Sequence, residues 1–217
     1  MNEITIIRHG QANSAAKDEA SYDRLSDLGH VQAGWLGEYV KSRNSFDHIV
    51  SGGMKRQIQT AQGMALADVP HTIDPRLNEL DYFGLAGSLN KIHGIALPND
   101  PASFTEHVPH VLHHWRDDAV CDELESYADF CARIMAAMQD INAMSGRVGV
   151  VSSTGVIATL GAMALGLDAM THARMFLRVR HTSMHKFTLD PDGVHLVQYG
   201  ATPHLDFADR AHARTHI

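Results

Sequence analysis

The chain has 217 residues, enough for one α/β domain with a buried core (residues 1–217) and short for two independent ones. Its 18 Lys and Arg residues against 25 Asp and Glu give a formal charge of -7, which argues against nucleic acid or an anionic membrane as a partner. No window approaches the roughly 18 apolar residues of a membrane span, and residues 1–7 show no signal-peptide pattern, so we expect a cytoplasmic protein. The only cysteines, Cys121 and Cys131, are too few for a disulfide framework, and Cys131 is expected to be a reduced thiol on an apolar helix face.

The stretch ITIIRHG, residues 4–10, predicts a short buried strand that ends in an arginine and a histidine. Gly10 permits the turn that follows. Ligands of open α/β sheets bind at the carboxyl ends of the strands, so Arg8 and His9 are expected at a binding edge. Histidine can act as a nucleophile near neutral pH, and the planar guanidinium of arginine suits phosphate. The pair indicates phosphoryl chemistry, with a structural Arg-His pair as the alternative.

A helix is predicted over residues 27–43, with Ser26 as its N-cap. Apolar residues follow at helical spacing. The face expected to pack on a sheet comprises Leu28, Val31, Trp35, Leu36, Tyr39 and Val40. The preceding residues 11–22 are polar and predict a loop beside the edge that carries Arg8 and His9.

A second strand is predicted over residues 47–51, and it runs through Gly52 and Gly53 into a helix over residues 54–65. Arg56 then lies in the first helical turn. A strand, a glycine turn and a helix N-terminus form a natural anion site, because the first backbone N–H groups of a helix have no partners within it. Arg56 is therefore a candidate phosphate ligand, and a solvated helix residue is the alternative.

Glu79 follows a third short strand over residues 71–74 and has apolar neighbours. A carboxyl group held against apolar surface has a raised pKa and can donate a proton. Glu79 is therefore a candidate general acid, and a surface glutamate in a loop is the alternative.

Residues 88–124 carry much of the chain's proline and histidine and predict an irregular, partly helical insertion that covers the site as a lid. Three histidines in it would share one helical face: His107, His110 and His114. We expect a solvated face of the lid and not a metal site, because carboxylate or cysteine partners at ligand spacing are not evident.

The rest of the chain predicts a long amphipathic helix over residues 127–141, a buried strand over 147–153 and an apolar helix that starts at Thr154-Gly155. A hairpin follows, with strands over residues 183–189 and 194–199. Alternating strands and helices predict a three-layer α/β sandwich, with a mainly parallel sheet and helices on both faces.

Five features occur in order and in register over nearly the whole chain. They are RHG after the first strand, the Arg-x-x-x-Thr-Ala turn from Arg56 to Ala61, LNEL followed by Gly84, the strand and turn before GVI, and the closing ATPHL. Together they resemble the histidine phosphatase superfamily, also called phosphoglycerate mutase-like.

The resemblance implies a phosphatase acting on a small phosphorylated metabolite, with no cofactor and no metal. His9 would carry a phosphohistidine, Arg8 and Arg56 would clamp the phosphoryl oxygens, and Glu79 would protonate the leaving oxygen. Two fixed guanidiniums would also depress the imidazole pKa and keep His9 neutral. Further candidates for binding phosphate or substrate are Gly10, Asn13, Ser153, Thr154 and Gly155.

The sequence departs from the family pattern at three places. The second active-site histidine and the glycine after it are Ser153 and Thr154, the Ser-Pro before the clamp arginine is Gly52-Gly53, and a common glutamate is Ala86. A serine hydroxyl is a shorter, neutral donor, so we expect slow turnover. His181 and His185 are candidates for replacing the missing imidazole, although packing is the favoured interpretation for each.

A second hypothesis, from another class, is a catalytically degenerate member that binds a phosphate-bearing ligand or partner. We favour the phosphatase because the nucleophile, both arginines and the acid all remain. A phosphoglycerate-type mutase ranks lower, since the sequence shows neither a lid that retains the intermediate nor a defined sugar-acid pocket. The oligomeric state is open, a homo-oligomer included.

Overall fold

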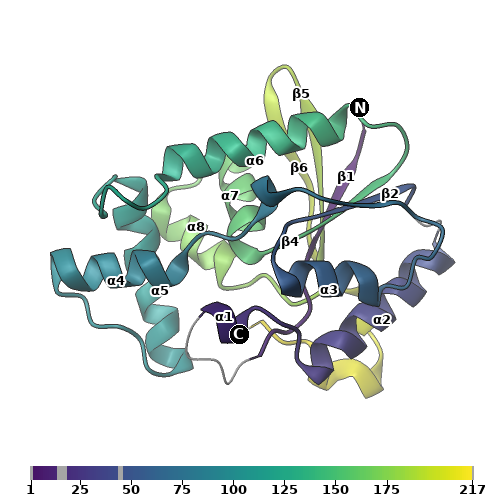
Figure 1. Cartoon of the computed structure of the whole chain (residues 1–217), viewed down its shortest axis with the longest axis horizontal. Coiled ribbons are helices and arrows are strands. Elements are labelled where there is room, and N and C mark those ends of the chain that lie inside the picture. Colours follow the sequence, from purple (N-terminus) through teal and green to yellow (C-terminus); the bar gives the residue numbers. More distant parts are fainter. Residues whose placement is uncertain (1, 14–18, 44–45, 217) are drawn as a thin grey trace.

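The computed structural model describes residues 2–13, 19–43 and 46–216, and a six-stranded sheet forms the centre of this part of the chain (Figure 1). In spatial order the strands are β3 (His71–Ile73), β2 (His48–Ser51), β4 (Val148–Ser152), β1 (Ile4–Arg8), β5 (Met184–Asp190) and β6 (Gly193–Ala201). The first four are parallel, and β5 pairs antiparallel with both β1 and β6. The expected mainly parallel sheet and closing hairpin are confirmed.

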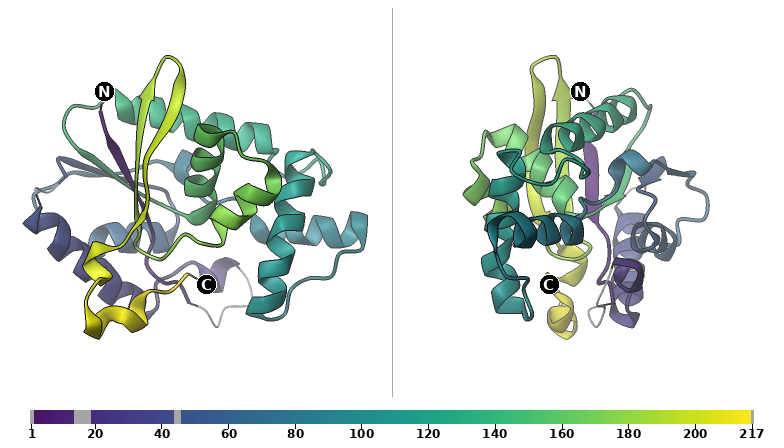
Figure 2. Two further views of the ribbon diagram at one scale, coloured as in Figure 1. Left: turned by 180° about the vertical axis from the view of Figure 1, so that it is seen from behind. Right: turned by 60° about the vertical axis from the view of Figure 1, so that its left-hand side comes forward.

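Helices cover both faces of this sheet, so the architecture has three layers (Figure 2). The helices in the described ranges are α1 (Glu19–Tyr22), α2 (Asp27–Ser42), α3 (Lys55–Gly63), α4 (Tyr82–His93), α5 (Pro101–Arg116), α6 (Tyr127–Asn142), α7 (Thr154–Leu165) and α8 (Ala169–Phe176). Successive strand side chains point to opposite faces. Accordingly Ile4 and Ile6 of β1 belong to the larger core with α4 to α8, whereas Ile7 belongs to the smaller core with α2 and α3.

Helix α2 begins as expected, and Leu36 and Val40 of its predicted buried face are buried, but the rest of that face differs from the prediction. Ser26 is the N-cap, and its Oγ accepts a hydrogen bond from the Gly29 backbone N–H (3.1 Å). Val31, expected on the buried face, is 46% exposed. The buried stripe instead contains small residues such as Gly37, where an added Cβ would lie 2.1 Å from the Met64 carbonyl oxygen. The helix therefore packs by close backbone approach, which hydrophobic periodicity alone does not reveal.

Two segments of the sequence-based prediction meet the structure only in part. Within the loop predicted over residues 11–22, residues 14–18 lie outside the described ranges, and Glu19–Tyr22 forms the helical turn α1. The predicted insertion over residues 88–124 contains the end of α4 and all of α5. Its role as a lid stays a prediction, as does the assignment of residues 1–217 to a single domain. None of the helices in the described ranges is long and apolar enough to cross a membrane.

The carboxyl ends of the parallel strands meet at one edge of the sheet. β1 leads there into His9, β2 into α3, and β4 into α7. The turn after β1 lies close to α2, because a Cβ on Gly10 would come within 2.6 Å of the Gly29 carbonyl oxygen. Glycine at position 10 thus allows the end of β1 to sit directly beside the first turn of α2.

Candidate active site

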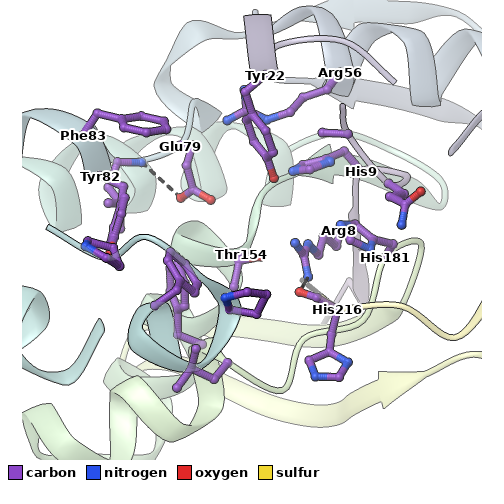
Figure 3. Close-up of a pocket in the computed structure, with 18 of the residues that line it drawn as sticks. Arg8, His9, Tyr22, Arg56, Glu79, Tyr82, Phe83, Thr154, His181 and His216 are labelled. Carbon is purple, nitrogen blue, oxygen red and sulfur yellow. Dashed lines mark hydrogen bonds between the residues drawn. The ribbon is translucent and has the colours of Figure 1, made fainter. Parts of the chain in front are cut away.

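A cavity of about 430 Å³ lies at this edge of the sheet, a volume typical of small-molecule sites (Figure 3). It is lined by Arg8, His9, Gln11, Ala12, Tyr22, Arg56, Glu79, Leu80, Tyr82, Phe83, Pro98, Asn99, Asp100, Pro101, Phe104, Thr154, Phe176, Leu177, His181 and His216. Five of the residues predicted from the sequence are in this lining, namely Arg8, His9, Arg56, Glu79 and Thr154.

His9 is held with one ring nitrogen engaged and the other available. Its Nδ1 lies 2.7 Å from the Gly10 carbonyl oxygen, which can only accept, so Nδ1 carries the proton of the neutral ring. Nε2 is then left with its lone pair. Burial is the main cause that lowers the His9 pKa well below its usual value, and the charges of Arg56 and Arg8 lower it further. His9 is therefore a neutral imidazole whose Nε2 can attack an electrophile.

Arg8 is a buried cation with hydrogen-bonding capacity to spare. Its side chain is 6% exposed. One terminal nitrogen donates to the Val179 and His216 carbonyl oxygens, the latter at 2.8 Å. The Nε atom is buried and has no hydrogen-bond partner in the described part of the chain. A buried guanidinium that is only partly satisfied favours an anion beside it.

Arg56 occupies the first turn of α3 and is 1% exposed. Its guanidinium pairs with Asp23 (3.1 Å) and lies 4.9 Å from the centre of the Tyr22 ring. The Thr60 hydroxyl donates to the Arg56 carbonyl oxygen (2.7 Å) and accepts from the Gly10 N–H (2.9 Å). This pair of hydrogen bonds ties the turn after His9 to the helix that carries Arg56, so both arginines flank the same imidazole.

Glu79 projects into the cavity (Figure 3). Its carboxyl oxygens accept from the Gly155 N–H at 2.9 and 3.2 Å, and one accepts from the Leu80 N–H at 3.1 Å. Burial raises the Glu79 pKa above its usual value and outweighs Arg56, these N–H groups and Arg8, which act in the opposite direction. A raised pKa keeps the proton on a carboxyl group to higher pH, which suits a proton donor to a substrate.

The remaining predicted phosphate-binding residues do not line the cavity. Ser153 is fully buried, and its Oγ accepts from Gln57 Nε2 (2.8 Å). The Asn13 side chain donates to the Ser21 carbonyl oxygen (2.9 Å). The N–H groups of Gly10 and Gly155 go to Thr60 and Glu79, so their contribution is to position the site. Gly155 must be glycine for this, because a Cβ there would lie 2.2 Å from Glu79 Oε1.

His181 lies in the cavity, whereas sequence reasoning favoured a packing role for it. Its ring centre is 5.9 Å from that of His9, in the loop between α8 and β5. Because β5 runs antiparallel to β1, the start of β5 lies beside the end of β1, which brings His181 to Arg8 and His9 (Figure 3). His185 does remain a packing residue, with Nε2 bonded to the Ser183 hydroxyl (2.8 Å).

A chain of hydrogen bonds holds the His181 ring in place through its Nδ1. Gln32 Oε1 accepts from the Gln11 N–H (2.8 Å), so Gln32 Nε2 is the donor to the Thr215 hydroxyl (3.1 Å). That hydroxyl also lies 2.9 Å from His181 Nδ1. The His181 pKa is lowered well below its usual value, chiefly by burial, so the ring is neutral. In the tautomer that carries the proton on Nε2, His181 can act as a donor there.

The histidine-rich segment is arranged differently from the solvated face that the sequence predicted. His107 is 5% exposed, and its Nδ1 lies 2.9 Å from the Tyr82 hydroxyl. His114 instead stacks on His93, with ring centres 4.1 Å apart. In the described ranges no group of three or more His, Cys, Asp or Glu side chains is placed to hold a metal ion.

Comparisons with known proteins agree with this geometry. The family model for the histidine phosphatase superfamily (branch 1) matches residues 4–202. No curated protein matches the sequence significantly.

Solved structures share the fold at low sequence identity. YhfR of Bacillus stearothermophilus has a TM-score of 0.68 and 19% identity, covering 94% of this chain and 99% of that one. The mycobacterial glucosyl-3-phosphoglycerate phosphatase Rv2419c, in complex with VO3, has a TM-score of 0.67 and 23% identity over 93% and 100% of the two chains. A phosphoserine phosphatase mutant of Entamoeba histolytica, in complex with phosphoserine, has a TM-score of 0.67 and 18% identity over 94% and 100%.

Proposed function

This chain belongs to the histidine phosphatase superfamily, and we propose that it is a phosphatase that hydrolyses a monoester of a small phosphorylated metabolite through a phosphohistidine at His9. The observation that carries this proposal is a neutral imidazole flanked by two buried guanidiniums, with Nε2 free to attack. Glu79, a carboxyl group with a raised pKa, lies in the same cavity. Nucleophile, anion clamp and proton donor thus converge on one site.

The first step forms a bond from His9 Nε2 to phosphorus and breaks the bond from phosphorus to the leaving oxygen. Glu79 passes its proton to that oxygen, so a neutral alcohol departs. Arg8 and Arg56 meet the negative charge that spreads over the phosphoryl oxygens. In the second step the Glu79 carboxylate takes a proton from water, whose oxygen attacks phosphorus while the bond to Nε2 breaks. Phosphate leaves, and both His9 and Glu79 return to their starting states.

His181 would support this reaction as a neutral donor to a phosphoryl oxygen, in the tautomer that carries its proton on Nε2. Such a donor is what the resemblance implies at position 153, where this chain has a serine that faces Gln57 instead of the cavity. The donor arrives from the loop before β5 and not from the turn after β4. We therefore expect His181 to offset part of the loss that makes this a slow enzyme.

The substrate of the phosphatase stays a prediction. The relatives named above act on or bind glucosyl-3-phosphoglycerate and phosphoserine, which supports a small phosphorylated substrate here. Action without a cofactor or metal, a cytoplasmic location and a homo-oligomeric state stay predictions as well. The degenerate, phosphate-binding member is the alternative that the following experiments separate from the enzyme.

Purified protein should release inorganic phosphate from p-nitrophenyl phosphate, and His9→Ala should abolish this release because the nucleophile is gone. Arg56→Ala should lower kcat/KM by about a hundredfold or more, since one clamp on the transferring group is lost. Lys55→Ala is the matched control, because Lys55 is the neighbouring cation but is exposed and outside the cavity lining. Equal losses in the two variants would contradict a specific clamp, and no release by the native protein would favour the degenerate member.

Glu79→Gln should lower kcat about a hundredfold for an alkyl phosphate and much less for p-nitrophenyl phosphate, whose leaving oxygen needs no proton.

The pH dependence of kcat/KM has a definite sign. Glu79 must be protonated to act as the acid, so kcat/KM falls as pH rises through the raised Glu79 pKa. His9 must be neutral to attack, so the fall in kcat/KM at low pH lies below the usual histidine range. Comparing the pH profiles of the native protein and of Glu79→Gln on the alkyl ester checks this. An alkaline limb that persists unchanged in Glu79→Gln would rule out Glu79 as its source.

His181→Ala should lower kcat roughly tenfold to a hundredfold with little change in KM, because the donor acts mainly on charge that develops in the transition state. Thr215→Val should cause a smaller loss, because it removes the hydroxyl that contacts His181 Nδ1, whereas Thr215→Ser keeps the hydroxyl and should retain activity. Vanadate inhibition provides a second readout, and its affinity should fall in parallel with kcat. Unchanged kcat and vanadate affinity in His181→Ala would show that His181 only packs.

A further inference from the structure

The cavity has two chemically different ends (Figure 3). His9 and Arg8 lie at one end with Tyr22 and Arg56, whereas Tyr82 and Phe83 lie at the other, and Glu79 stands between them. Resting on the proposed function, we propose that the substrate is the phosphate monoester of an uncharged, apolar alcohol that carries a ring. The phosphate would occupy the cationic end, Glu79 would reach the bridging oxygen, and the rest of the substrate would fill the apolar end.

Aromatic side chains from two helices form the apolar end. Tyr82 and Phe83 begin α4, and Phe104 lies in the first turn of α5. The Tyr82 ring centre is 5.1 Å from that of Phe104 and 6.0 Å from that of Phe83, so the three rings form a continuous wall. Phe176 and Leu177, at the end of α8, complete the apolar lining. Pockets with such walls gain affinity from apolar surface that a ligand removes from water.

Tyr82 presents its ring, and not its hydroxyl, to a ligand. The hydroxyl is bonded to His107, which is outside the cavity lining. Burial raises the Tyr82 pKa, so this phenol stays neutral. Against this ring, a hydroxyl of a sugar or a glycerol chain would find no hydrogen-bond partner. An aromatic or alicyclic group would stack on the same surface at no such cost.

The apolar end carries a negative charge, which would repel an acidic group on the substrate. Asp100 lines this end and caps α5, with Oδ1 accepting from the Ser103 N–H (2.8 Å). That hydrogen bond is the main cause of a lowered Asp100 pKa, so the carboxylate is ionised at neutral pH. Among the described residues of the lining, the Lys and Arg side chains are Arg8 and Arg56 alone, both at the phosphate end. A carboxylate on the leaving group would thus face Asp100, and no Lys or Arg side chain of the described lining lies at that end to pair with it.

Three monoesters of primary alcohols test the proposal, because their leaving oxygens are alike while the rest of the molecule differs. They are 2-phenylethyl phosphate, glycerol 3-phosphate and 3-phosphoglycerate. We expect kcat/KM for 2-phenylethyl phosphate to exceed that for glycerol 3-phosphate by about tenfold or more, with 3-phosphoglycerate the poorest substrate.

Phe83→Lys places a cation in the apolar end, and the 46% exposure of Phe83 makes the change tolerable for folding. This variant should reduce the preference for 2-phenylethyl phosphate over 3-phosphoglycerate by about tenfold. Ile92→Lys is the matched control, because Ile92 is on the same helix, is 49% exposed and does not line the cavity. It should leave the preference unchanged.

The outcomes separate the substrate class from the proposed function. If glycerol 3-phosphate or 3-phosphoglycerate is hydrolysed as efficiently as 2-phenylethyl phosphate, the apolar substrate class is wrong and the phosphatase stands. Equal effects of Phe83→Lys and Ile92→Lys would also overturn it, because the wall would then not select the substrate. No phosphate release from any of the three, nor from p-nitrophenyl phosphate, would reject the phosphatase and this inference with it.

Discussion

The structure of this site depends on two guanidiniums buried beside one imidazole. Arg8 and Arg56 are 6% and 1% exposed, and burying a charge is costly unless it is paired and hydrogen-bonded. Asp23 pairs with Arg56, and two carbonyl oxygens accept from Arg8, which offsets part of the cost. Burial, assisted by these two charges, keeps His9 neutral. Arg8, whose carbonyl partners are uncharged, favours an anion in the cavity. Glycine at position 10 and the Thr60 hydroxyl hold this arrangement together.

The same burial shifts the pKa values of His9 and Glu79 in opposite directions. Desolvation disfavours the charged form of any group, so it lowers the His9 pKa and raises the Glu79 pKa. Both shifts favour the neutral forms of the two groups that we propose as nucleophile and proton donor. Pairs of groups whose pKa values are moved apart by their surroundings identify the acid and the base of many enzymes. Gly155 positions Glu79, because its N–H donates to the Glu79 carboxyl group in the cavity.

The strands and the central residues of the site could be predicted, because they depend on local sequence. A short apolar strand followed by Arg8 and His9, and a glycine turn before Arg56, indicate the same edge of a parallel sheet. The position of His181 in the cavity could not be predicted in this way, since it depends on β5 pairing antiparallel with β1 and on a contact with Thr215, 34 positions away. The prediction that Ser153 binds phosphate was wrong for a related reason. Its place at the end of β4 predicted a side chain in the cavity, but the Ser153 hydroxyl accepts from Gln57, which is distant in the sequence, and faces away from the cavity.

A direct test of the account is to look for the covalent intermediate on His9. The native protein would be mixed with p-nitrophenyl phosphate, quenched within milliseconds in alkali, where phosphohistidine survives, and digested for peptide mass spectrometry. The account predicts one added phosphoryl group on the peptide that contains His9, a burst of p-nitrophenol of matching size, and neither signal in His9→Ala. Phosphate release by the native protein with no label on His9, or a label that persists in His9→Ala, would contradict it.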